Sequence, residues 1–162
     1  MNIVRNVLIA FALFMFATAS HAESTCVKGA TQFNVQAFAV SFHTLAVVVR
    51  DNGGMKAVQE VMTPEQLDIA TDAVTKMYAF GAKGGKCFAL SHDEARGLVT
   101  ALVIMADWVG KHNLDSVANA QFIKDAGSEA NAAKLMGVFD EIGNALADHG
   151  GLHHGGGKDM GL

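Results

Sequence analysis

Apolar residues recur at the spacing of an α-helix along almost the whole chain after residue 30, and this regularity is the strongest constraint on the fold. Four stretches keep the pattern over several turns, about residues 31–50, 63–80, 91–111 and 128–149. No stretch shows the sustained alternation of apolar and polar residues that a half-buried strand needs. The only proline, Pro64, stands where a helix begins. The sequence therefore predicts an all-α protein.

Two shorter helical stretches, about Met55–Met62 and Asp115–Ala126, lie between the long ones. The stretch Thr31–Arg50 is apolar nearly all round, which is typical of a central, mostly buried helix. Short connections favour neighbouring helices that run roughly antiparallel. We therefore expect a single helical bundle of four long helices plus one or two short ones.

Local signals fix where several helices begin and end. Thr63 with Gln66 and Ser91 with Glu94 form the pattern of a capping box, and Ser128 is a further N-cap. The helix after Thr63 should end near Phe80, with residues 81–86 as a glycine-rich loop. Its expected buried stripe comprises Leu67, Ala70, Val74, Met77 and Tyr78, and that of the last helix includes Leu135, Met136 and Phe139.

Residues 1–22 have the three parts of a secretory signal peptide. Arg5 precedes an unbroken apolar run, Val7–Phe16, and the small residues of Ala17–Ala22 follow it. A membrane-spanning anchor is the alternative, but it needs roughly 20 apolar residues. Cleavage after Ala22 leaves a helical domain at residues 23–148 and a flexible, Gly/His-rich tail at 149–162. We expect a periplasmic or secreted protein with no stable membrane insertion after cleavage.

The chain has two cysteines, Cys26 and Cys87. In an oxidising compartment such a pair is most simply one disulfide. The bridge would close a loop of about 60 residues and stabilise the fold by roughly 4 kcal/mol in the chain-entropy model. Two buried free thiols are the alternative, and the spacing excludes a catalytic CxxC pair.

The charge of the chain and its lack of catalytic motifs reduce the number of functions that it could have. Twelve Lys and Arg residues stand against 16 Asp and Glu residues, and they form no basic cluster, so nucleic acids and anionic membranes are poor partners. The chain has no HExxH pair, no nucleophile elbow and no phosphate-binding loop. These observations favour a protein that is not an enzyme.

The tail suggests a metal site. His149, His153 and His154 lie among glycines, and neutral imidazoles bind Cu(II), Ni(II) and Zn(II). A structural zinc site would need four well-placed ligands, which the spacing does not supply. A metal-handling protein is therefore the alternative function, and a solvated tail without metal is the simpler interpretation of this segment.

A second candidate site lies on the first long helix. Gln36, His43 and Arg50 are spaced by seven and lie on one side of an otherwise apolar helix, where they could line a surface groove. Taken alone, His43 is more simply interpreted as a half-exposed surface residue than as a ligand. The favoured function is an exported small helical binding protein, such as an inhibitor, an immunity-type factor or a secretion accessory factor, and its expected partner is another protein.

Overall fold

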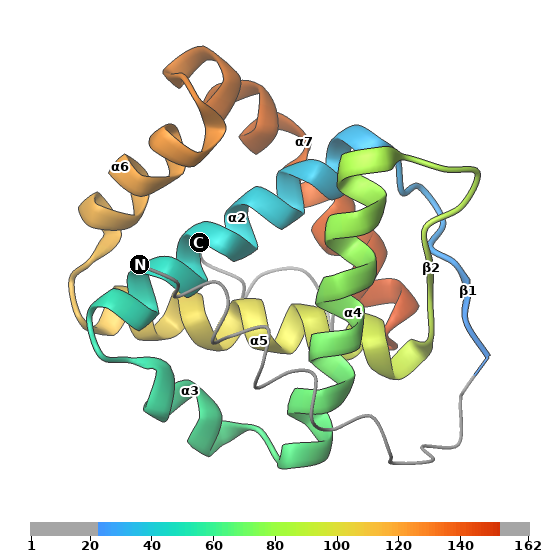
Figure 1. The fold of residues 1–162 in the computed structure, drawn as a ribbon, viewed down its shortest axis with the longest axis horizontal. Helices are drawn as coiled ribbons and strands as arrows, with labels where there is room; N and C mark the ends of the chain where they lie inside the picture. Colours follow the sequence, from blue (N-terminus) through green and yellow to red (C-terminus); the bar gives the residue numbers. More distant parts are fainter. Residues whose placement is uncertain (1–22, 153–162) are drawn as a thin grey trace.

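The computed structural model describes residues 23–152, and α-helices make up most of this part of the chain (Figure 1). The helices are α2 (Gln32–Asp51), α3 (Met55–Val61), α4 (Pro64–Lys83), α5 (His92–Lys111), α6 (Asp115–Ala126) and α7 (Glu129–His149). Two short strands, β1 (Thr25–Cys26) and β2 (Ala89–Leu90), pair in antiparallel fashion. The predicted all-α class is confirmed. The expected signal peptide and most of the expected tail lie outside the described residues.

Helix α2 is the central element. It packs against α4, α5, α6 and α7, and its side chains Val35, Phe38 and Val49 are fully buried. The ring of Phe38 stacks on that of Phe139 with centroids 5.7 Å apart. By length and composition alone α2 could cross a membrane, but 44% of its most apolar window is buried inside this fold. Burial against several neighbours accounts for its apolar surface.

Four of the helices are long, but the expected bundle of four long, roughly antiparallel helices is not confirmed. Helices α2, α4 and α5 have 20 residues each and α7 has 21. In Figure 1, α4 crosses α5 at an angle instead of lying alongside it. Gly97 allows a close approach there, because a Cβ on this residue would lie only 3.3 Å from Ala70 Cα. A segment that contains β2 joins α4 to α5, so the connection does not impose a hairpin of helices.

Side-chain capping marks the starts of the four long helices. The Thr63 hydroxyl accepts from the Gln66 amide at 3.2 Å, and the Ser91 hydroxyl accepts from the Glu94 amide at 3.2 Å. Both predicted capping boxes are therefore present. A further box, between Thr31 and Asn34, begins α2.

The expected loop after Phe80 is partly wrong, because α4 continues to Lys83. Gly81 is buried inside the helix, where a Cβ would lie 3.4 Å from Gln36 Cα on α2. Close packing of the two helices thus offsets the weak helix propensity of glycine. Met136 also departs from expectation, because it is 52% exposed at the edge of the buried stripe of α7.

Residues 24–27 form an N-terminal strap that pairs with β2, just before the start of α5. The predicted disulfide between Cys26 and Cys87 is present, with Cα atoms 5.4 Å apart. Next to it, the Val27 amide donates to the Phe88 carbonyl at 2.8 Å. A structural disulfide of this kind is typical of proteins that work in an oxidising, extracytoplasmic compartment.

Candidate functional site

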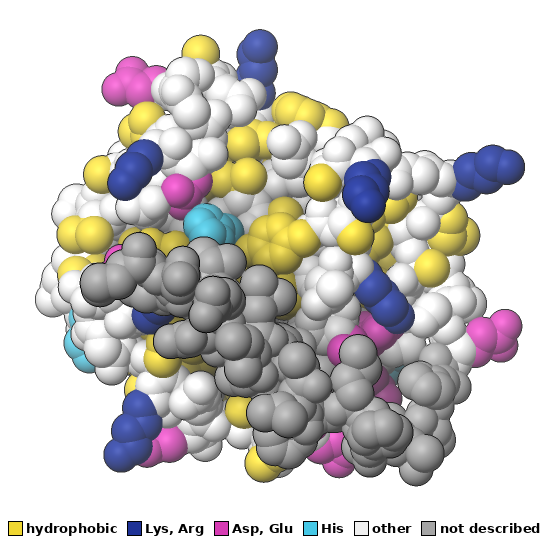
Figure 2. All heavy atoms as spheres, viewed as in Figure 1, with side chains coloured by type: hydrophobic (Ala, Val, Ile, Leu, Met, Phe, Trp, Pro, Cys, Tyr) yellow, Lys and Arg dark blue, Asp and Glu magenta, His cyan; other side chains and the backbone are white. Residues whose placement is uncertain are grey.

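A surface pocket of about 330 Å³ lies between α2, α4 and α6. Its lining comprises Gln36, Ala39, Val40, His43, Tyr78, Gly81, Ala82 and Asp125. The face that contains it is shown in Figure 2, where a histidine lies beside hydrophobic side chains near the middle of the view. Figure 1 shows that α2 passes between α4 and α6 in this region. The lining therefore combines apolar side chains with several polar groups.

Helical spacing explains how the lining is assembled. The α2 residues stand at positions 36, 39, 40 and 43, and the α4 residues at 78, 81 and 82. Residues three or four positions apart share one face of a helix, so each helix contributes one stripe. Gly81 lets the two helices approach closely at the pocket, and α6 contributes Asp125 to the lining.

The carboxylate of Asp125 is held by two neutral donors. Thr44 Oγ1 donates to Asp125 Oδ2 at 2.8 Å, and Gln121 Nε2 donates to Oδ1 at 2.7 Å. Thr44 is buried on α2, and Gln121 precedes Asp125 by one turn of α6. The two hydrogen bonds fix the orientation of the carboxylate at the pocket.

Tyr78 is 39% exposed and lines the pocket, so its expected place in the buried stripe of α4 is wrong. Partial burial of the phenol, together with the negative charge of Asp125, raises the pKa of Tyr78 to about 12. The hydroxyl therefore stays protonated at neutral pH and is able both to donate and to accept a hydrogen bond.

The predicted groove residues are only partly brought together. Gln36 and His43 both line the pocket, whereas Arg50 lies near the end of α2, where its Nε is 2.8 Å from Asp51 Oδ1. Tyr78 and Asp125 were missed as site residues. The spacing of Tyr78 favoured the core, and nothing in the local sequence around Asp125 indicates that α6 packs beside α2.

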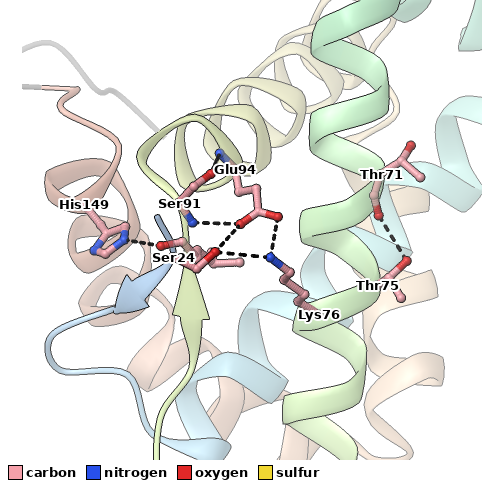
Figure 3. Close-up of polar contacts among 8 residues, drawn as sticks. Ser24, Thr71, Thr75, Lys76, Ser91, Glu94 and His149 are labelled. Carbon is pink, nitrogen blue, oxygen red and sulfur yellow. Dashed lines mark hydrogen bonds and ion pairs between the residues drawn. The ribbon is translucent and has the colours of Figure 1, made fainter. Parts of the chain in front are cut away.

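A second polar cluster joins the strap to α4 and α5 (Figure 3). The carboxylate of Glu94 is buried, and its Oε1 pairs with Lys76 Nζ at 2.6 Å. Its Oε2 accepts the Ser91 amide at 2.7 Å and the Ser24 hydroxyl at 3.5 Å. In Figure 3 these groups all point toward the Glu94 carboxylate. The Lys76 amine, the Ser91 amide and the Ser24 hydroxyl therefore each have the Glu94 carboxylate as a partner.

This cluster superficially resembles a serine–lysine catalytic pair. Ser24 Oγ and Lys76 Nζ are 3.5 Å apart. An amine base must have a free lone pair to take a proton from the hydroxyl. Lys76 Nζ instead contacts Glu94 Oε1 at 2.6 Å, and the nitrogen of an ion-paired amine has no such lone pair. The arrangement is suited to holding the strap in place.

His149 is the only predicted metal ligand among the described residues. Its Nε2 lies 2.8 Å from the Leu90 carbonyl oxygen, which can only accept, so Nε2 bears the proton. His153 and His154 lie outside the described residues. Within residues 23–152, no group of three or more His, Cys, Asp or Glu side chains is placed to hold a metal ion. Metal binding by the tail stays a prediction.

Comparison of the chain with protein-family models, curated proteins and solved structures finds no match. The contacts in the structure must therefore distinguish between the Glu94 cluster and the pocket as the candidate site. In the Glu94 cluster every charged group has a partner within the protein. The pocket instead leaves polar groups around an open cavity, which is the usual form of a binding site.

Proposed function

We propose that this is an exported protein that binds another protein through the pocket between α2, α4 and α6. The single observation that supports this most strongly is the convergence of Gln36, His43, Tyr78 and Asp125 around one cavity. The four side chains offer an amide, an imidazole, a phenol and an oriented carboxylate.

The apolar part of the lining suits the same role. Ala39, Val40 and Ala82 provide apolar surface for a group bound in the pocket. Partner proteins commonly anchor an interface by placing one large side chain in a pocket of this kind, surrounded by weaker contacts. A cavity of about 330 Å³ has room for such a side chain.

Export is supported by the leader-like residues 1–22 and by the disulfide between Cys26 and Cys87. We place the protein in the periplasm or outside the cell. The expected result is that native material begins at Glu23 when its N-terminus is determined by mass spectrometry. Material that retains residues 1–22 would contradict cleavage.

Site-specific photocrosslinking tests the binding function. A photoreactive amino acid at Ala82, an exposed residue of the lining, should give a discrete adduct in cells that produce the protein naturally. The same group at Asp140, an exposed residue of α7 outside the lining, is the matched control and should not give it. Adding His43→Ala to the Ala82 probe should weaken the adduct. Identical adducts from both probe positions, or none from Ala82, would count against this use of the pocket.

A further inference from the structure

The pocket presents a carboxylate that no cation of the described chain neutralises. Asp125 accepts hydrogen bonds from Thr44 and Gln121, which are both uncharged. Among the ion pairs of residues 23–152, none involves Asp125. A carboxylate has about four acceptor positions, and the two hydrogen bonds leave some of them open.

Apart from the His43 imidazole, the rest of the described lining has no side chain that could carry a positive charge to offset Asp125. It contains no lysine or arginine among the described residues. Lys124 is adjacent in sequence, but consecutive residues of a helix point in different directions, and Lys124 is not part of the lining. A negatively charged group entering the pocket would therefore meet an unfavourable field, and a positively charged one a favourable field.

Tyr78 offers a second interaction with a cation. Its ring lines the same pocket as Asp125, and the faces of aromatic rings attract ammonium and guanidinium groups. Burial is the larger cause of the raised pKa of Tyr78, and the negative charge of Asp125 is the second cause, which agrees with the closeness of the two side chains. Ala39, Val40 and Ala82 provide apolar surface for the methylene stem that links such a cation to a protein backbone.

We propose that the occupant of the pocket is a lysine or arginine side chain of the partner protein, with its cationic group on Asp125 and Tyr78 and its stem against the apolar walls. This inference rests on the proposed binding function and specifies the chemistry of the partner.

Amide chemical shifts of the disulfide-bonded mature protein test the inference. The probes are two blocked glycine-rich peptides, one with a central lysine and one with acetyl-lysine, which keeps the stem and removes the charge. Free n-butylammonium and valerate complete the set. The lysine peptide should shift the amides of Ala39, Ala82 and Asp125, and the acetyl-lysine peptide should bind about tenfold more weakly or worse.

Two variants assign the effect to the carboxylate. Asp125→Asn should lower the affinity for the lysine peptide about tenfold. Asp140→Asn makes the same change of charge on the exposed surface of α7 and should leave the affinity unchanged. Tyr78→Leu should lower it about two- to fivefold, as expected for loss of a cation–π contact.

The outcomes separate this inference from the proposed function. Equal binding of the two peptides, or a preference for valerate, would overturn the cation while leaving the pocket as a binding site. Tighter binding of n-butylammonium than of the lysine peptide would overturn the assignment to a protein side chain in favour of a free amine. If no probe shifts the pocket amides, the proposal of a cationic occupant is again overturned. Crosslinking at Ala82 then tests the binding function independently.

Discussion

Helix α4 contributes to two polar regions of opposite character. Lys76 neutralises the buried Glu94 carboxylate and helps to hold the N-terminal strap. Tyr78, only two positions later and therefore on a different side of the helix, lines the pocket beside Asp125. Both regions are built around one carboxylate that receives two close hydrogen bonds or ion pairs from other residues.

The difference lies in the charge of the donors. Glu94 has an ammonium partner and little contact with solvent, so its interactions are complete within the protein. Asp125 has only neutral donors and faces a cavity. The first arrangement stabilises the fold. The second keeps its charge available to a ligand, and the two regions should respond differently to mutation.

Loss of the disulfide should have the largest effect of all the changes considered. It should lower the free energy of unfolding and leave binding at the pocket unchanged. Cys26→Ser with Cys87→Ser removes a bridge between residues 61 positions apart. The chain-entropy model gives a decrease of about 4 kcal/mol in the free energy of unfolding. Urea unfolding of the variant and of the oxidised protein measures this change. The pocket is formed by α2, α4 and α6 and should keep its affinity for the lysine peptide wherever the variant is folded.

A decrease below about 1 kcal/mol would show that the strap contributes little to stability. Reduction of the unmutated protein is the control for the serine substitutions, because it breaks the same bond without changing the sequence. Lost affinity in a variant that remains folded would contradict the separation of the two regions.

Substitutions of Glu94 and Asp125 should give the next largest effect, a difference between the two variants in the free energy of unfolding. Glu94→Ala removes the ion pair with Lys76 and the acceptor of the Ser91 amide. We expect the free energy of unfolding to fall by about 2 kcal/mol. Asp125→Asn should cost less than about 1 kcal/mol, because the amide can still accept from Gln121 and can donate to Thr44 Oγ1.

Glu141→Ala is the matched control for Glu94→Ala, because Glu141 is an exposed carboxylate on α7. It should change the free energy of unfolding by no more than about 0.5 kcal/mol. All three variants are compared by urea unfolding at one pH. A greater loss of stability from Asp125→Asn than from Glu94→Ala would reverse the roles that we assign to the two carboxylates.

The helices could be predicted from sequence because their signals are local. Thr63 with Gln66 and Ser91 with Glu94 lie within one turn of the helix that each pair begins, and the structure confirms both boxes. The disulfide could be predicted because the chain has only two cysteines. The crossing of α4 and α5 could not, since it depends on small residues such as Gly97 that meet another helix.

The candidate site could be predicted only in part. Gln36 and His43 interrupt an apolar helix, and that polar line is visible in the sequence. Tyr78 continues a regular apolar stripe, and spacing alone does not distinguish the centre of a stripe from its exposed edge. The hydrogen bond between Thr44 and Asp125 joins residues 81 positions apart, and no local pattern encodes it.

The smallest expected effect concerns the phenol of Tyr78, which is the only tyrosine of the chain. Its phenolate absorbance can therefore be followed without ambiguity during an alkaline titration. The midpoint should lie near pH 12 in the folded protein and near the ordinary value of about 10 in urea. In Asp125→Asn the pKa should fall but stay above 10, because burial, the larger cause, remains.

The same shift predicts how stability depends on pH. Well below pH 10 the phenol is protonated in both states, so the full contribution of Tyr78 is present. As the pH rises from about 10 to 12, the unfolded chain releases this proton first, and the free energy of unfolding falls. Because Tyr78 is 39% exposed, solvent screening should limit the loss to about 1 kcal/mol. Tyr78→Phe should lack this component when unfolding is compared across the same pH range. A wild-type midpoint near 10 would mean that neither burial nor Asp125 acts on the phenol, and the pKa of Tyr78 would then give no support to the cation proposal.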